Sequence, residues 1–188
     1  MKNEVSGVRG IFCFPSFPVA VACVKENPMT LAAVNFFSFN PPMVGIGIMD
    51  NRYSYELIRE VGDFTLNLPY VDQLDVTHYI GTVSGRDVDK FKETGLTPVK
   101  GKHVSSSWIK EFPVSMECKL VYTLDLKGSH VWFIGTVLTA YVEETYDRSQ
   151  TISYWGNQYR RTGEELAIMK IEGDGKNAKA VGLTRKIE

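Results

Sequence analysis

Asn51, Arg52 and Ser54 stand where a strand-like apolar segment, Met43–Met49, gives way to a segment with helical spacing of apolar residues. A strand that ends at the start of a helix leaves backbone N–H groups free, and here a guanidinium and a hydroxyl stand beside them. Together these groups can bind an oxyanion. The sequence therefore predicts a ligand site at this junction, for a ligand that carries a phosphate group.

A second polar loop lies further along the chain, at Ser84–Phe91, and reads Ser-Gly-Arg-Asp-Val-Asp-Lys-Phe. It is the other candidate phosphate-binding segment, because it contains a hydroxyl at its start and a cation, Lys90, near its end. The alternative interpretation is that Arg52 and Lys90 are ordinary solvated surface charges, which is the usual fate of such residues.

Gly45 and Gly47 lie on one face of the predicted strand Met43–Met49. A glycine-lined strand face typically marks the close approach of another backbone or of a flat ligand. A tight barrel interior explains the same pattern equally well. The phosphate-type loop that follows directly favours the ligand.

Several common site motifs are excluded. Gly45 and Gly47 are not followed by the third glycine of a dinucleotide fingerprint, and they lie inside a strand. The chain has no P-loop motif, and Gly81–Gly85 carries serine in the fourth position rather than the third position of a nucleophile elbow. The cysteines and histidines show no paired metal spacing, so no metal site is predicted; they are Cys13, Cys23, Cys118, His78, His103 and His130.

Strand patterns dominate the elements that must position these loops. Val114–Leu126 alternates apolar and polar residues, Lys127–Ser129 has turn composition, and His130–Val142 is again strand-like, so these segments predict a long hairpin. Thr30–Asn40 is expected to be one extended segment, and Phe64–Leu68 a short strand. The alternation places Val114, Met116, Cys118, Leu120, Tyr122 and Leu124 on one face of the first hairpin strand.

Two windows have helical spacing: Ser54–Val61, which ends at Gly62, and more weakly Asp72–Ile80, which ends at Gly81. Helices are thus few and peripheral. The pattern as a whole predicts a mainly β protein, an antiparallel barrel of six or seven strands with helices packed at its ends. With no internal repeat and no linker, residues 1–188 are expected to form a single domain.

Composition excludes several classes of function. Lys and Arg (21) nearly balance Asp and Glu (22), so the chain lacks the basic surface that nucleic-acid binding needs. It also lacks a basic run for a membrane surface and an apolar stretch of the ~18 residues that would span a bilayer.

The apolar segment Ile11–Val24 could mimic a secretory signal, but Pro15 and Pro18 interrupt it, and Val19, Val21 and Cys23 alternate as in a strand. The strand interpretation is favoured. The odd cysteine count fits a reduced chain, so a cytoplasmic location is expected.

With these segments in place, the chain resembles the flavin reductase-like, FMN-binding split-barrel proteins, in particular the flavoredoxin branch. The resemblance covers about residues 15–165 and depends on the order and spacing of its parts rather than on any single one. The parts are Phe17-Pro-Val-Ala-Val21, Asn35-Phe-Phe-Ser-Phe-Asn-Pro-Pro42, Asn51-Arg-Tyr-Ser-Tyr-Glu-Leu-Ile58, Phe64–Leu68, Ser84–Phe91 and the hairpin residue His130.

The resemblance implies an antiparallel Greek-key split β-barrel that forms a homodimer, with one noncovalent FMN per subunit near the dimer interface. It also implies that hydride passes from NAD(P)H to flavin N5 and that electrons pass on to a small acceptor or a partner protein. Two alternatives stay open. One is an FMN-binding electron-transfer protein that oxidises NAD(P)H poorly, and the other is a split-barrel module for a different cofactor such as haem.

On this resemblance, the FMN phosphate is expected to contact Arg52 and Ser54 at the helix start and Lys90 from the second loop, with Ser84 also near the ligand. Tyr53 is a further expected cofactor-binding residue. The flavin ring is expected to lie along a strand from Thr30 to Phe37. Its expected contacts there are Thr30, Asn35 and Phe36.

His130 is a candidate flavin or nicotinamide contact, although a lone histidine beside a turn is more often structural. Tyr159 belongs to a late aromatic cluster, Tyr154–Arg160, that could cap the flavin or pack across the dimer. Hydride transfer needs orientation of the two rings rather than a general acid or base, so no catalytic side chain is assigned.

Overall fold

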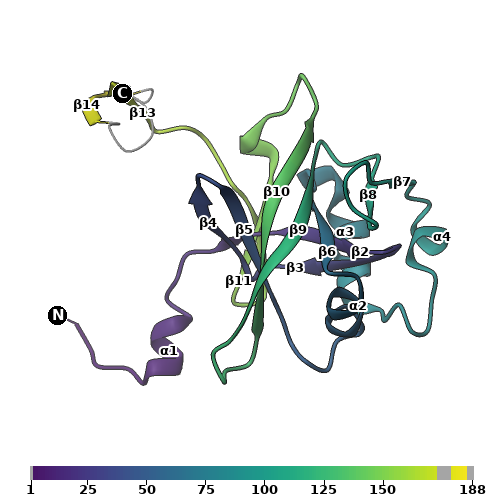
Figure 1. The fold of residues 1–188 in the computed structure, drawn as a ribbon. Coiled ribbons are helices and arrows are strands. Elements are labelled where there is room, and N and C mark those ends of the chain that lie inside the picture. The colour runs from purple at the N-terminus through teal and green to yellow at the C-terminus, as the bar shows by residue number, and fades with distance from the viewer. Residues whose placement is uncertain (1, 173–178, 186–188) are drawn as a thin grey trace.

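A seven-stranded antiparallel sheet forms the body of the protein, in a computed structural model that describes residues 2–172 and 179–185. Its strand order is β3-β2-β6-β9-β10-β5-β4 (Figure 1). The strands are β2 (Ala20–Val24), β3 (Asn27–Leu31), β4 (Val34–Phe39), β5 (Pro42–Ile48), β6 (Asp63–Leu68), β9 (Val114–Asp125) and β10 (Val131–Val142). The mainly β, antiparallel class expected from the sequence is confirmed.

Within the residues that the structure describes, three smaller sheets and a few short helices accompany this body. The sheets pair β1 (Phe17–Pro18), β11 (Ile152–Trp155) and β12 (Gln158–Arg161); β7 (Pro98–Lys100) and β8 (Ser107–Ile109); and β13 (Ala167–Glu172) and β14 (Lys179–Arg185). The α-helices are α1 (Gly7–Ile11), α2 (Tyr53–Val61), α3 (Leu74–Thr82) and α4 (Lys90–Thr94), and two 3-10 turns are η1 (Val71–Gln73) and η2 (Arg148–Gln150). None of the described helices is long and apolar enough to cross a membrane.

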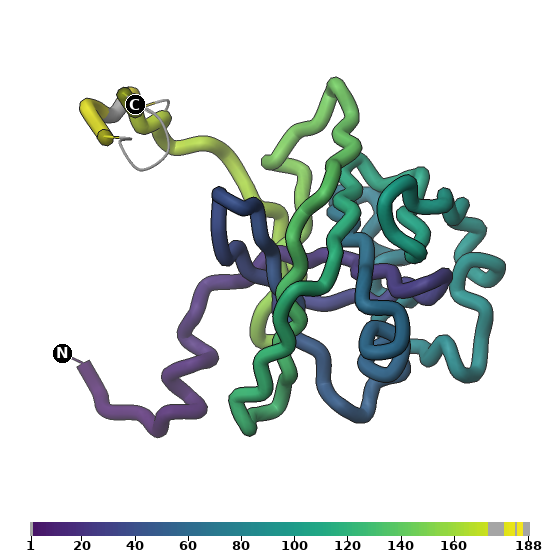
Figure 2. Tube along the Cα trace, viewed as in Figure 1, coloured from purple at the N-terminus to yellow at the C-terminus, as the bar shows by residue number. Residues whose placement is uncertain are grey.

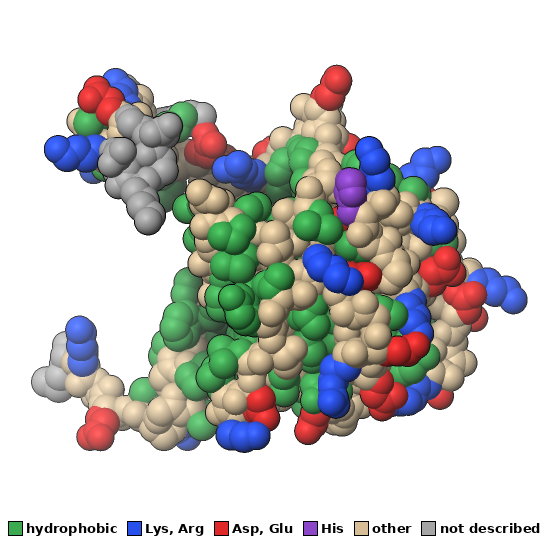
Figure 3. All heavy atoms as spheres, viewed as in Figure 1, with side chains coloured by type: hydrophobic (Ala, Val, Ile, Leu, Met, Phe, Trp, Pro, Cys, Tyr) green, Lys and Arg blue, Asp and Glu red, His purple; other side chains and the backbone are tan. Residues whose placement is uncertain are grey.

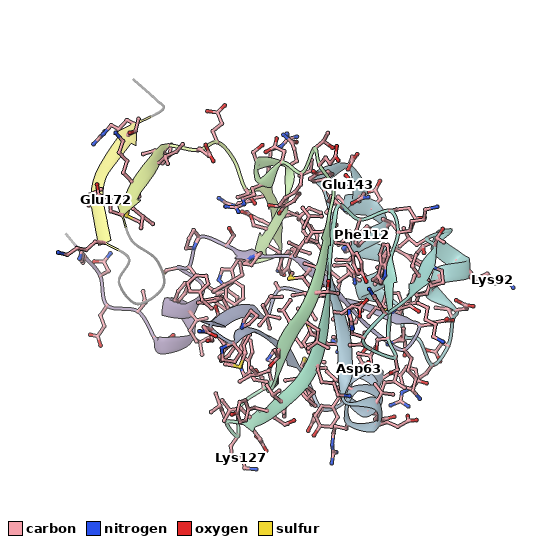
Figure 4. The ribbon with its side chains drawn as sticks, turned by 45° about the horizontal axis from the view of Figure 1, so that its top comes forward. Asp63, Lys92, Phe112, Lys127, Glu143 and Glu172 are labelled. Atoms are coloured by element: carbon pink, nitrogen blue, oxygen red, sulfur yellow. The ribbon has the colours of Figure 1, made fainter. Side chains whose placement is uncertain are left out.

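Strand β2 is buried on both of its faces, which explains where the helices lie. Ala20 and Ala22 belong to one apolar cluster with Phe64 and Phe133, whereas Val21 and Cys23 belong to a second cluster. Helix α2 packs into the first cluster, and α3 and α4 pack with Phe112, labelled in Figure 4, into the second. All three helices lie away from α1 (Figure 1). The strand interpretation of the segment around Val19–Cys23 is therefore confirmed.

The predicted hairpin of β9 and β10 is confirmed, with Val131 opposite Asp125 and Lys127 at its tip (Figure 4). The expected single buried face is present only in its first half. Cys118 is fully buried, but Tyr122 and Leu124 are 63% and 41% exposed. The strands still pair along their whole length, with two register shifts, so the distal half of the hairpin extends beyond the core.

The single extended segment expected over Thr30–Asn40 is wrong. The chain bends at Ala32 and Ala33, and β3 and β4 form opposite edges of the seven-stranded sheet. The carbonyl of Ala33 accepts a hydrogen bond from the N–H of Gly47 at 2.7 Å, which fixes the bend against β5. Small side chains at the bend permit this close approach.

The first predicted helix is confirmed as α2, which ends where Gly62 takes a left-handed conformation at φ 66°. The second predicted helix, α3, continues through Gly81 to Thr82 rather than ending at the glycine. Glycine fits at position 81 because a β-carbon there would lie 3.1 Å from the β-carbon of Thr30. Helix α4 was not predicted from the sequence. The N-terminal segment before β1 and the β13–β14 hairpin extend from the same side of the body (Figure 2).

Candidate functional site

A cavity of about 400 Å³ lies where β3, the end of β5, the start of α2 and the loop after α3 meet. Strand β5 delivers the chain to α2, and α3 packs against β3, so both predicted loops open into the same space. The lining residues are Asn27, Met29–Ala33, Gly47–Met49, Asn51–Ser54, Ile80–Arg86, Lys90 and His130.

The start of α2 forms one end of this cavity. Arg52 stands at the N-cap position in an extended conformation, and none of the described side chains caps this helix end. Ser54 is buried, and its Oγ accepts a hydrogen bond from Asn27 Nδ2 at 2.8 Å. The Ser54 hydroxyl therefore keeps its own hydrogen to donate to a ligand, next to the positive end of the helix dipole.

Lys90 brings a buried positive charge to the same end. Its side chain is only 5% exposed, and its Nζ donates hydrogen bonds to the carbonyls of Pro28, at 2.9 Å, and Ile80, at 2.8 Å. An ammonium group has three donors, so one remains for a ligand. Burial, together with the nearby charge of Arg52 and against the opposing effect of Cys23, lowers the pKa of Lys90 to about 8.

The loop after α3 covers the start of α2. Arg86 places its guanidinium 4.8 Å from the centre of the Tyr53 ring and forms an ion pair with Glu56. Ser84 Oγ accepts a hydrogen bond from the Arg86 N–H at 3.2 Å. Gly85 fits closely over Asn27, because any β-carbon at position 85 would collide with the Asn27 amide.

Small residues narrow another part of the cavity. A β-carbon at Gly47 would lie 2.9 Å from the β-carbon of Ala33, so the bend between β3 and β4 approaches β5 too closely for a side chain at position 47. Gly45, by contrast, is covered by the ring of Phe37 and is not a lining residue. At Gly45 an aromatic side chain of the same protein fills the space over the glycine, whereas at Gly47 the chain at Ala33 approaches closely and the glycine belongs to the cavity wall.

The chemistry of the cavity suits a flat, negatively charged ligand. Among the described residues that line it, Arg52, Arg86 and Lys90 are positively charged, and none is Asp or Glu. Asn27 Oδ1 is buried against Gly85 and has no hydrogen-bond partner among the described residues. The described residues contain no cluster of three or more potential metal ligands.

The structure brings most of the predicted site residues together. Those that line the cavity are Thr30, Arg52, Tyr53, Ser54, Ser84, Lys90 and His130. The Thr30 hydroxyl is already used, since it donates to the carbonyl of Thr77. His130 is half-buried, and its Nδ1 lies 2.8 Å from Ser129 Oγ.

Asn35, Phe36 and Tyr159 are not among the lining residues. Asn35 and Phe36 lie on β4, past the bend, where Phe36 is half exposed and packs against Phe39. The Tyr159 ring contacts Tyr154, and its hydroxyl lies 3.1 Å from His78 Nδ1. The expected place of Asn35 and Phe36 along one strand with Thr30 is therefore wrong, because β3 ends at Leu31 and β4 begins at Val34.

Sequence reasoning missed Asn27 and Arg86. Asn27 follows the tight turn at Lys25 and Glu26, so it resembles an ordinary turn residue, and its contacts to Ser54 and Gly85 come from distant parts of the chain. Arg86 lies inside the predicted polar loop. Its positive charge next to Gly85 was the sequence signal that could have identified it as a site residue.

Comparisons with known proteins agree with this geometry. Residues 12–163 match the family model described as "Flavin reductase like domain". An uncharacterized protein of Archaeoglobus fulgidus is 35% identical over 139 residues, covering 73% of this chain and 78% of the relative.

Two solved structures are also similar. The flavoredoxin of Desulfovibrio vulgaris superposes with a TM-score of 0.80 at 28% identity, covering 89% of this chain and 97% of that one. An FMN-binding protein of Thermus thermophilus shares the fold, with a TM-score of 0.75 at 22% identity over 88% of this chain and 97% of that one. This chain therefore belongs to the flavin reductase like family, with the split-barrel fold, and is a flavin-related oxidoreductase.

Proposed function

We propose that the chain binds FMN noncovalently in the cavity and acts as an NAD(P)H-dependent flavin reductase of the flavoredoxin type. The observation that carries the proposal is the charge of the cavity, where Arg52, Lys90 and the uncapped start of α2 meet without a lining carboxylate among the described residues. A phosphate with close to two negative charges is the natural partner of this arrangement. When bound, FMN supplies the redox chemistry, accepting hydride from NAD(P)H and passing electrons to a small acceptor or partner protein.

The protein's own contribution is to bind and to orient. Arg52, Ser54 and Lys90 hold the phosphate, while the close approach of Gly47 to Ala33 provides a flat surface for the flavin ring. His130 lies at the rim as a further contact for the flavin or the nicotinamide. Since hydride transfer depends on alignment of the two rings, fixed walls matter more here than acid or base groups.

We also propose that the protein is a homodimer, as the family resemblance implies. Support comes from large apolar side chains left in solvent on β4 and on the distal half of the β9–β10 hairpin. These are Phe36, Phe37, Phe39, Val121, Tyr122 and Leu124, and Phe39 is 86% exposed. Figure 3 shows hydrophobic side chains gathered on one face of the molecule. Large exposed apolar patches typically mark interfaces with other proteins.

The visible spectrum tests the proposed function directly. The protein purified with added FMN is expected to absorb at about 370 and 450 nm, and NADH or NADPH added without oxygen is expected to bleach the band at the longer wavelength. A flavin spectrum that persists would instead favour an electron-transfer protein reduced by another donor. No flavin binding at all would refute the proposal.

Removal of the phosphate contacts is expected to weaken FMN binding selectively. Each charge-assisted contact is worth about 1.5–3 kcal/mol, so Arg52→Ala should raise the FMN dissociation constant about 10- to 100-fold, and Arg52→Ala with Lys90→Ala more. Riboflavin lacks the phosphate, so its dissociation constant should be nearly the same for Arg52→Ala as for the wild-type protein. Arg59→Ala is the matched control, because Arg59 lies on the same helix over the Tyr55 ring and outside the cavity. Equal losses for both flavins would contradict the phosphate assignment.

FMN affinity is expected to fall as the pH rises through about 8, where Lys90 loses its proton in the free protein. Only the protonated ammonium attracts the phosphate, so affinity should be constant between about pH 7, where the phosphate is fully ionised, and this pKa, and should decline by up to about tenfold per pH unit above it. Lys90→Arg stays charged and should remove the decline between pH 7 and 9. Fluorescence titration at each pH measures the FMN dissociation constant. If affinity declines equally in Lys90→Arg, a group other than Lys90 causes the decline.

Sedimentation equilibrium tests the homodimer. We expect the wild-type mass to be twice that of the chain, and Phe39→Asp or Tyr122→Asp to shift the equilibrium toward the monomer, because each places a charge in the proposed apolar interface. Glu60→Gln, a change to an exposed residue paired with Lys25 near α2, is the control. A wild-type monomer at micromolar concentration would contradict the dimer.

A further inference from the structure

A second cavity of about 490 Å³ adjoins the first one at its phosphate end. Five residues line both spaces: Asn27, Tyr53, Gly85, Arg86 and Lys90. The second cavity continues between the turn after β2, helix α2 and the loop that leads to α4. Its other lining residues are Lys25, Glu26, Leu57, Asp87, Val88 and Asp89.

The partition between the two cavities is thin and depends on Arg86. Its guanidinium covers one face of the Tyr53 ring at 4.8 Å and is held there by the ion pair with Glu56. Both side chains of the pair are substantially exposed, 46% for Arg86 and 55% for Glu56. Such an exposed pair can open at little cost. Asn27 and Gly85 close the other part of the partition, with no room for a side chain at position 85.

We propose that Arg86 determines the choice between mononucleotide and dinucleotide flavins in this protein. The inference rests on the proposed function, since it takes the phosphate end of the first cavity to be the end next to Lys90. With the Arg86–Glu56 pair closed, the first cavity ends just past one phosphate, as FMN requires. With the pair open, the adenylate half of FAD enters the second cavity.

The residues that line the second cavity suit the adenylate half of FAD. Once the guanidinium moves away, the uncovered face of Tyr53 becomes a stacking surface for a purine. Arg86 and Lys90 remain within reach of a second phosphate, because both line the two cavities. The nearby carboxylates of Glu26, Asp87 and Asp89 balance the cations, so the outer part of the cavity favours a neutral base and sugar rather than a further phosphate.

The strength of the contacts that hold Arg86 determines how strongly the wild-type protein prefers FMN to FAD. An exposed ion pair together with a cation–π contact is worth a factor of about 5 to 30 in an equilibrium constant. FAD binding must overcome this factor in the wild-type protein, whereas FMN binding need not. The wild-type protein should therefore prefer FMN to FAD by at least that factor.

Equilibrium titrations of the full chain with FMN, FAD and riboflavin test the inference in four proteins: wild type, Glu56→Gln, Arg86→Ala and Arg59→Ala. Glu56→Gln is the sharper variant, because it releases Arg86 without removing a charge from either cavity. Because the contact of Arg86 with the Tyr53 ring remains, it should lower the dissociation constant of FAD by the ion-pair share alone, about 1.5- to 5-fold, and leave that of FMN unchanged. Arg86→Ala should also lower the ratio of the FAD dissociation constant to the FMN dissociation constant. Arg59→Ala should give the same ratio as the wild type.

Two results would overturn the inference while leaving the proposed function intact. One is equal affinity of the wild-type protein for FMN and FAD. The other is an FMN-to-FAD ratio that stays the same in both Glu56→Gln and Arg86→Ala. If none of the three flavins binds to any of the four proteins, the proposed function fails and this inference fails with it.

Discussion

Burial of the Lys90 ammonium is the interaction on which the site depends. A charge removed from water needs hydrogen-bond partners, and Lys90 finds them in the carbonyls of Pro28 and Ile80. It thereby links the start of α4 to β3 and to the last turn of α3, three elements that surround the cavity. Carbonyl groups solvate the charge without neutralising it. Folding thus leaves a fixed positive charge and a free hydrogen-bond donor at the cavity. An anionic ligand can pair with this charge and accept the remaining hydrogen bond.

The architecture that holds Lys90 in place follows from strand β2. Both faces of β2 are buried, so one side of the sheet packs on α2 and the other on α3 and α4. The sequence predicted the elements whose signals are local: the alternation of β9 and β10, and α2 with its stop at Gly62. It could not predict the bend at Ala32 and Ala33, since alanine carries no turn signal. It also missed α4, which is too short to show helical periodicity.

The same distinction explains which site residues could be found. Arg52 and Ser54 were predictable because a strand-to-helix junction is visible over a few consecutive residues, and Lys90 because its loop resembles that of a known family. Asn27 was not, since its importance arises from contacts with Ser54 and Gly85 that only the folded chain creates. Asn35 and Phe36 were misplaced because the prediction extended one strand across the bend. A single sequence gives no local signal for long-range contacts or for chain reversals that lack turn residues.

The exposed half of the β9–β10 hairpin and the cavity are not independent features. His130, which lines the cavity, is followed directly by β10, and the first residues of β10 pair with Leu124 and Asp125 at the exposed end of β9. Leu124 pairs with Trp132, whose ring lies next to Gly47 in the cavity wall, so exposed apolar residues of β9 lie close to the cavity. In the proposed homodimer, a partner subunit over these residues would also restrict water near the cavity, and exclusion of water strengthens each charge interaction inside. Assembly and ligand binding are expected to support one another through this shared edge.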